Sequence, residues 1–190
     1  TWMALMRHAC SVFDGYGGVW NNSPLYRSYD IVLYLVTLYG WRLEFAHPRL
    51  QSDPVIVRAA IHDTGLSLQH AGAELRADRD IVLDAVTNNG LALQFASPAI
   101  RNSDLGVVLQ AVIRNGGALQ FAGPDMKNNF GIVFAAISSY PPSFQFAGPV
   151  ARNDFFIALC AVTRYPQSFQ FASAELRNNA QIRAAAGWAT

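Results

Sequence analysis

The stretch GLALQFASPAIRN, from Gly90 to Asn102, recurs with small changes along this chain of 190 residues. Variants of it, such as GLSLQHAGAELRA and SFQFAGPVARN, occur both before and after it. The central motif, (L/F)-(Q/E)-(F/H)-A, occurs six times at steps of 25 residues, with one step of 26. A motif in near-constant register is the signature of a tandem repeat. The six copies begin at Leu43, Leu68, Leu93, Leu119, Phe144 and Phe169.

A helix is expected to begin at the same place in every repeat. Each expected start carries a residue whose side-chain oxygen can accept a hydrogen bond from an unpaired helix N–H. Apolar runs such as IVLDAV, from Ile81, come next, and apolar residues on nearly all sides predict a helix buried between its neighbours. The seven expected N-cap residues are Ser28, Asp53, Asp78, Asp104, Asn129, Asp154 and Asn179.

Glycine follows this helix in four copies and proline in the last two. A glycine at that place favours the left-handed conformation that ends many helices. Proline cannot adopt a positive φ, so we expect the turns at Pro141 and Pro166 to be built differently. We expect a second short helix to carry the recurring motif, followed in several copies by one more helical turn that opens with proline. The glycines are Gly40, Gly65, Gly90 and Gly116.

A unit of about 25 residues cannot bury a core alone, so neighbouring units must stack. We therefore predict an all-α fold, an α-solenoid of about six 25-residue two-helix repeats over residues 25–179, with a partial seventh repeat at 180–190. Residues 1–24 depart from the repeat, and we interpret them as an N-terminal capping or docking segment. The start at Thr1 and the end within a repeat suggest a processed, shortened or fragmentary chain, whose open end another protein could cover.

The segment DIVLDAVTNNGLALQFAS, from Asp80 to Ser97, resembles the tandem helical repeats of the DUF4116 family, a domain of unknown function. The resemblance rests on the pattern (I/V)V(L/F)xAV…GxxLQFA and covers about residues 25–180. It implies a repeat array and no particular activity. Pro141 and Pro166 depart from the glycine that is usual in the family.

Two polar columns recur with the repeat. A glutamine column, with Glu44 in its first copy, is too regular for a single catalytic amide, so we predict that it ties down backbone groups at a turn. A basic column could form an anion-binding stripe, for example for RNA phosphates, or its cations could pack their stems on the next layer and meet helix-end carbonyls or acids. The near-neutral net charge favours the second interpretation. The columns are Gln69, Gln94, Gln120, Gln145 and Gln170, and Arg76, Arg101, Lys127, Arg152 and Arg177.

Some columns are polar in one repeat and aromatic in another. Arg79 and Asp80 stand where Phe155 and Phe156 stand later, and a column that accepts Arg and Asp is expected to be exposed. Aromatic residues at exposed places favour a protein-binding patch, and local repacking around the proline turns is the alternative. The expected patch comprises Tyr29, Phe130, Tyr140, Phe155, Phe156 and Tyr165.

The overall composition excludes several classes of function. Formal net charge is +1, so no global field attracts nucleic acid or an anionic membrane. The two cysteines form no disulfide framework, and no apolar run approaches the roughly 18 residues of a membrane span. The histidines show no metal-ligand spacing, and no nucleophile–base pair can be assembled. We therefore expect no metal, no cofactor and no catalysis. For the location we hypothesise the inside of the cell, with an organelle as one option.

The function predicted from the sequence is a non-catalytic scaffold or protein-interaction subunit of a larger assembly. A protein partner is expected at the open C-terminal end or on the aromatic face. The alternative is an RNA-binding array that uses the basic column.

Overall fold

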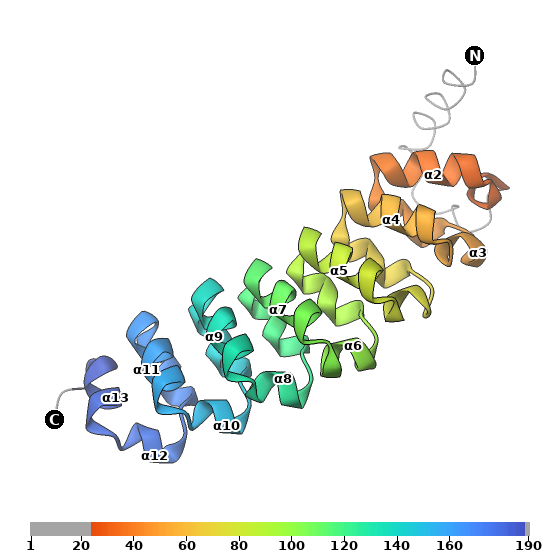
Figure 1. Cartoon of the computed structure of the whole chain (residues 1–190). Helices are drawn as coiled ribbons and strands as arrows, with labels where there is room; N and C mark the ends of the chain where they lie inside the picture. The colour runs from red at the N-terminus through yellow and green to blue at the C-terminus, as the bar shows by residue number, and fades with distance from the viewer. Residues whose placement is uncertain (1–23, 189–190) are drawn as a thin grey trace.

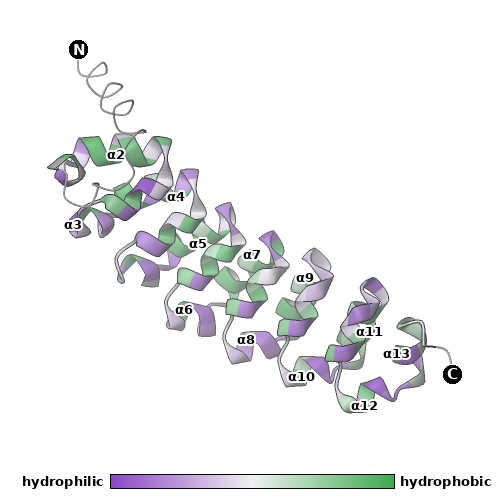
Figure 2. Ribbon diagram, turned by 180° about the vertical axis from the view of Figure 1, so that it is seen from behind, coloured by the Kyte–Doolittle hydropathy of each residue, from purple (hydrophilic) through white to green (hydrophobic). Residues whose placement is uncertain are grey.

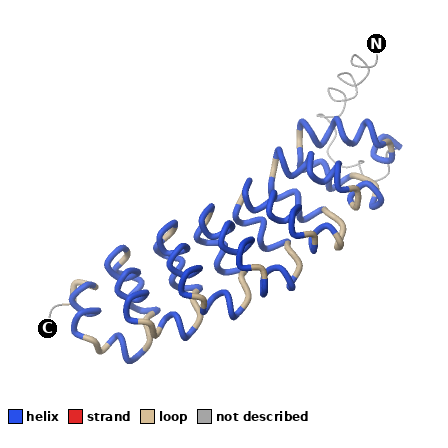
Figure 3. The backbone as a smooth tube through the Cα atoms, viewed as in Figure 1, coloured by secondary structure: helices blue, strands red, loops and turns tan. Residues whose placement is uncertain are grey.

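The computed structural model describes residues 24–188, which form an elongated array of helices (Figure 1). All regular structure in this part of the chain is helical, and Figure 3 shows no strand in it. Each repeat stacks on the one before and the one after it, as in a solenoid. The predicted all-α array of stacked repeats is confirmed, and the expected segment at residues 1–24 lies, apart from Pro24, outside the described residues.

Every repeat consists of three pieces rather than two. The first is a ten-residue α-helix, the second a six-residue 3-10 helix with the recurring motif, and the third a short turn of helix. The long helices are α2 (Tyr29–Leu38), α4 (Pro54–Asp63), α5 (Arg79–Asn88), α7 (Leu105–Arg114), α9 (Phe130–Ser139) and α11 (Phe155–Arg164). The 3-10 helices are η3 (Gly40–Phe45), η4 (Gly65–His70), η6 (Gly90–Phe95), η7 (Gly116–Phe121), η8 (Pro141–Phe146) and η9 (Pro166–Phe171). The third pieces are α3 (Pro48–Gln51), η5 (Leu75–Ala77), α6 (Pro98–Ser103), α8 (Pro124–Asn128), α10 (Pro149–Arg152) and α12 (Ala174–Arg177).

Two shorter pieces flank these six repeats. Helix α13 (Ala180–Ala185) packs on α11 and begins a further repeat. The 3-10 helix η2 (Pro24–Arg27) precedes α2 and stands where a third piece of an earlier repeat would stand. The carbonyl of Tyr26 in η2 accepts a hydrogen bond from the N–H of His47 at 2.9 Å. The same bond links the third pieces of later repeats.

Side-chain caps start the long helices as the sequence predicts. The Asp53 carboxylate accepts hydrogen bonds from the N–H groups of Val55 and Ile56 at 2.9 and 3.1 Å. Equivalent caps come from Asp78, Asp104, Asn129, Asp154 and Asn179, whereas the side chain of Ser28 makes no cap hydrogen bond. Each such cap satisfies helix N–H groups that have no carbonyl partner within the helix.

The core runs as one continuous strip along the array. In α4 the side chains of Ile56, Val57, Ala60 and Ile61 are buried. The first hydrophobic residue of the motif, such as Leu93, is buried between the long helices of successive repeats, and Figure 2 shows apolar residues passing from one repeat to the next. The buried positions recur at the third, fourth, seventh and eighth residues of the long helices, so one face is buried and the other points outward. The expectation of helices buried on nearly all sides was wrong.

The glycines after the long helices have negative φ, so the predicted left-handed conformation was wrong. Their role is close approach: a Cβ on Gly90 would lie 2.3 Å from the carbonyl oxygen of Ala111 in the next repeat. Because the backbone there has no need of positive φ, Pro141 and Pro166 begin their 3-10 helices in the same way, and the expected difference in turn geometry is absent.

Candidate functional site

The outward face of the long helices divides into a charged part and an apolar part. Outward positions are the first, second, fifth, sixth and ninth residues of each helix, opposite the buried ones. In α4 and α5 these positions include Arg58, Arg79, Asp80 and Asp84. In α7, α9 and α11 none of them carries a charged residue, and the exposed charges of these helices are Arg114 and Arg164 at their last residues.

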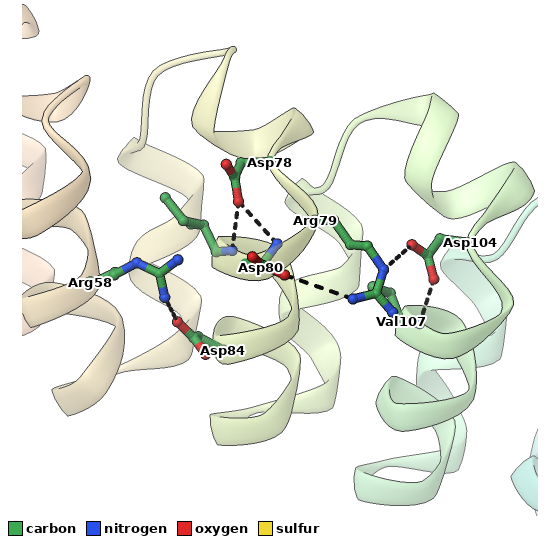
Figure 4. A network of polar contacts seen from close by, with 8 residues as sticks. Arg58, Asp78, Arg79, Asp80, Asp84, Asp104 and Val107 are labelled. Atoms are coloured by element: carbon green, nitrogen blue, oxygen red, sulfur yellow. Dashed lines mark hydrogen bonds and ion pairs between the residues drawn. The ribbon is translucent and has the colours of Figure 1, made fainter.

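Ion pairs organise the charged part, as Figure 4 shows. Arg58 of α4 pairs with Asp84 of α5. Arg79 of α5 donates from Nε to Asp104 at 2.9 Å, and the other carboxylate oxygen of Asp104 caps α7 at Val107. These side chains are substantially exposed, apart from the Asp104 carboxylate. The pairs therefore link successive repeats and contribute only modestly to stability.

The apolar part exposes large side chains on three consecutive helices. We call it the apolar face and define it by the five most exposed of these residues. Exposed fractions of 48–78% are high for such residues, and an exposed cluster of this kind marks an interaction surface more often than isolated exposed residues do. The apolar face consists of Leu105 (49%) and Ile113 (53%) on α7, Phe130 (48%) and Phe134 (52%) on α9, and Phe156 (78%) on α11.

The structure brings together only part of the predicted aromatic patch. Phe130 belongs to the apolar face, and Phe156 packs edge-to-face on the half-buried Phe155 with ring centroids 5.6 Å apart. Tyr140 and Tyr165 lie at the other ends of α9 and α11, as C-cap residues. Tyr29 lies on α2, at the far end of the array.

Sequence reasoning missed Phe134, Leu105 and Ile113. One signal could have found them, since Phe134 follows Phe130 by four residues and Ile113 follows Leu105 by eight, so each pair lies on one helical face. Comparing equivalent positions of the repeats identifies aromatic residues that replace charged ones. It does not identify positions such as these, which are apolar in several repeats.

The basic column lies on the third pieces of the repeats, away from the apolar face. Four of its five side chains are half-buried, and Arg177 is exposed. Arg152 donates from Nη2 to the carbonyl of Gln145 at 2.6 Å, at the end of η8. Gln51, which holds this column in the first full repeat, donates to the carbonyls of Leu43 and Glu44 at 3.0 and 3.1 Å. A neutral amide can thus replace the cation, which favours a role in capping the 3-10 helix.

The charges of the column are nevertheless not paired with acids. No residue of the column forms an ion pair within residues 24–188. The pKa of Lys127 is lowered, chiefly by burial of the ammonium group and secondly by the nearby positive charge of Arg101. Like charges in successive repeats therefore lie close enough to oppose each other.

The backbone of the basic column links one repeat to the next. The carbonyls of Arg76, Arg101, Lys127 and Arg152 each accept a hydrogen bond from the N–H of the residue before the following third piece, and the carbonyl of Gln51 accepts one from Gly72, three residues before η5. These bonds are 2.7–3.1 Å long and recur with the repeat. They hold successive third pieces at a constant spacing.

The glutamine column behaves as a set of backbone clips in three repeats. Gln94 donates from Nε2 to the carbonyl of Leu91 at 3.1 Å, and Gln120 and Gln145 make the same bond three residues back. These bonds lie inside single 3-10 helices, so the prediction is confirmed for these three residues. Gln69 and Gln170 are exposed and make no such bond.

The C-terminal end of the described chain is partly covered by its own residues. Ile182 of α13 is buried, and the indole ring of Trp188 stacks on Phe169 of η9 at 5.4 Å between centroids. Trp188 itself stays 59% exposed. The expected protein partner at this end stays a prediction.

Three further features of residues 24–188 complete the description. A cavity of about 500 Å³ near the start of the array is lined by Arg27, His47, Arg49, Leu50 and Asp53. Within the described part of the chain, no three His, Cys, Asp or Glu side chains could together hold a metal ion. Nor does any helix between residues 24 and 188 have the length and apolar character to cross a membrane.

One comparison with known proteins gives a match. The model of a family described as a domain of unknown function, DUF4116, matches three segments, residues 28–76, 56–101 and 104–149. Together these matches cover most of the repeats. No curated protein and no solved structure matches the chain.

Proposed function

The chain belongs to the DUF4116 family, and because that description assigns no activity, we propose a function from the surface itself: a non-catalytic helical-repeat scaffold that binds another protein surface through the apolar face. The supporting observation is the exposure of five large apolar side chains on α7, α9 and α11. The first, second, fifth, sixth and ninth residues of these helices carry no charge, and the exposed Arg114 and Arg164 lie at the last residues of α7 and α11. Burying such a surface against a partner is favourable, by roughly 25 cal/mol for each Å² of apolar area removed from water.

The neighbouring charged part of the array supports the same proposal. Its ion pairs satisfy charges within the chain and give that surface ordinary solubility. The five side chains that define the apolar face carry no charge, and the polar residues at the other outward positions of these helices are the neutral Gln110, Ser138 and Thr163. A rigid array of stacked repeats also presents the face on three helices whose relative positions are fixed by the core, which limits the entropy lost on binding.

Photo-crosslinking in cells tests this function. A benzophenone amino acid placed at Phe134 should form covalent adducts with protein, because that side chain lies in the middle of the apolar face. The matched control is the same amino acid at Val55, which is 54% exposed on the outward face of α4 but lies in the charged part. Adducts at position 134 that are absent at position 55 support the proposal, and equal yields at the two positions contradict it.

We propose RNA binding through the basic column as the alternative function. It is favoured by the like positive charges of Lys127 and Arg101, which repel each other. Neither charge forms an ion pair with an acid within the described residues. Replacing Arg101 and Arg152 together by Ala should lower the slope of log affinity against log salt by about 1.4 for single-stranded RNA. Arg49→Ala with Arg114→Ala removes two other exposed charges and is the control. An unchanged slope in the first pair contradicts this alternative.

A further inference from the structure

We propose that the occupant of the apolar face is a second copy of this chain, held in a two-fold symmetric dimer. The inference rests on the proposed function and names its partner. Its grounds are the size of the face, its lack of charge, and its symmetry about α9.

The exposed area suits a dimer. A large side chain that is half exposed presents about 100 Å², so the five residues of the apolar face present roughly 500 Å². The half-buried outward residues Leu109, Phe155 and Leu159 add to this. The total approaches the ~800 Å² per partner of a standard specific interface, and lies at the upper end of the ~300–600 Å² that the largest apolar patch of a typical monomer covers.

The chemistry of the face selects a partner without charge. Any partner must present an apolar surface of similar size with no unpaired charge, because an ionic group buried there would have no counter-charge. The apolar face itself meets that requirement. The formal net charge of +1 also means that two copies repel each other only weakly.

The arrangement of helices supplies the symmetry. The face covers α7, α9 and α11, with α9 in the middle (Figure 1). A two-fold axis parallel to α9 therefore places α9 against α9 and α7 against α11 of the second copy, at matching heights along the helices. The same residues serve both copies, as an isologous contact requires. The arrays run in opposite directions, and α4 lies outside the contact.

This pairing also sets a protruding side chain against a position that has none, beside the ion pair of Arg79 and Asp104. Phe156 is the most exposed residue of the face, at 78%. It is the second residue of α11, and the second residue of α7 is Gly106, which has no side chain. The axis places these two positions opposite each other. Phe134, the fifth residue of α9, then faces its own copy across the axis.

Sedimentation equilibrium of the purified full chain tests the dimer. The wild-type mass should rise with concentration from 20.8 kDa to twice that value. Phe134→Asp should weaken dimerisation at least about 30-fold, because it places two like charges at the axis. Val55→Asp should dimerise as the wild type does. Circular dichroism confirms that each variant is folded, and Phe156→Asp replaces Phe134→Asp if that variant is unfolded.

A cysteine crosslink tests the symmetry axis separately. With Cys10 and Cys160 replaced by Ser and Ala, Phe134→Cys should form an intermolecular disulfide on mild oxidation, and Val55→Cys should not. A wild-type chain that stays monomeric at every concentration overturns the inference, as does a Phe134→Asp variant that still dimerises or a Phe134→Cys variant that does not crosslink. If the purified chain is monomeric while position 134 crosslinks another protein in cells, only this inference fails and the proposed function stands.

Discussion

Gly90 shows how a single residue sets the distance between repeats. The carbonyl of Ala111 in the next long helix points at its Cα, and an added Cβ would lie 2.3 Å from that oxygen and 3.0 Å from the backbone nitrogen of Asn115. Backbone atoms cannot turn aside as a flexible side chain can. Gly40, Gly65 and Gly116 stand equally close to the carbonyls of Ala60, Ala85 and Ala136.

We predict that Gly90→Ala destabilises the chain by about 1–3 kcal/mol, because α7 must move away from η6. Gly106→Ala is the matched control: its Cβ would meet only the end of the Arg79 side chain at 3.2 Å and the Asp104 carboxylate at 3.4 Å. Alanine in the first turn of α7 should be neutral or stabilise by up to about 1 kcal/mol. Denaturant titration of dilute protein measures both, and equal midpoints for the two variants would contradict the packing role of Gly90.

His70 is the one departure from phenylalanine at the third position of the recurring motif, which otherwise holds Phe45, Phe95, Phe121, Phe146 and Phe171. Burial lowers the pKa of His70 below its ordinary value of 6.5, and the charge of Glu44 opposes this to a smaller extent. The folded chain therefore favours neutral His70. The stability that depends on it is complete above pH 6.5 and is lost as the pH falls through the lowered pKa.

His70→Phe should remove this dependence. Unfolding free energies of the variant and the wild type are measured by denaturant titration between pH 7 and pH 5. The unfolding free energy of the variant relative to that of the wild type should increase toward pH 5, because only the wild type takes up a proton at this position on unfolding. A constant difference across the range would show that His70 has no such role.

At the scale of elements, the ends of the long helices join neighbouring repeats. Asn88, the last residue of α5, accepts a hydrogen bond from the N–H of Gly65 at 2.9 Å and donates to the carbonyl of His62 at 3.0 Å. Asp63 accepts the equivalent bond from Gly40 at 2.7 Å. In the later repeats Ser139 and Arg164 donate to carbonyls at the end of the preceding long helix.

Asn88→Ala should cost about 1–2 kcal/mol, since it removes both bonds and leaves two backbone groups without these partners. Asn88→Asp keeps the acceptor and should cost less. Thr87→Ala, at the exposed neighbouring position, should change little. Thermal unfolding distinguishes the three variants by a few degrees, and equal transitions for Asn88→Ala and Thr87→Ala would contradict the linking role.

The sequence predicts where the helices begin and recur better than it predicts which of their residues are exposed. Six of the seven N-caps and the repeat period follow from residue types whose hydrogen bonding is local, so the pattern alone suffices. The sequence of α9, FGIVFAAISS, is apolar at most positions, and nothing within it distinguishes the exposed Phe134 from the buried Ile137. That distinction depends on where α7 and η7 lie. The 3-10 form of the motif and the close approach at glycine likewise depend on the adjoining repeat.

At the scale of the whole molecule, the array is not uniform along its length. Pro141 occupies the position at which the earlier repeats have a glycine, where the next long helix approaches closely. Helix α11 packs less closely against α9 than α9 packs against α7. A proline carries a Cβ and a ring, so the carbonyl of Ala161 cannot approach η8 as Ala111 approaches η6. In a linear array, stability is a sum of repeats and their interfaces, and cooperativity breaks first at the weakest interface.

We therefore predict that α11, α12 and α13 open as a unit while α4 to α9 stay folded. Native-state hydrogen exchange should show faster exchange at the amides of Ala161 and Val162 than at Ala111 and Val112, although all four side chains are fully buried. The difference has to persist in Phe134→Asp, so that a dimer contact on the outer face cannot cause it. Pro141→Gly, which removes the ring and lets α11 approach, should bring the two sets of rates closer together. Equal protection of both sets in the unaltered chain would mean that the proline leaves the coupling between repeats intact.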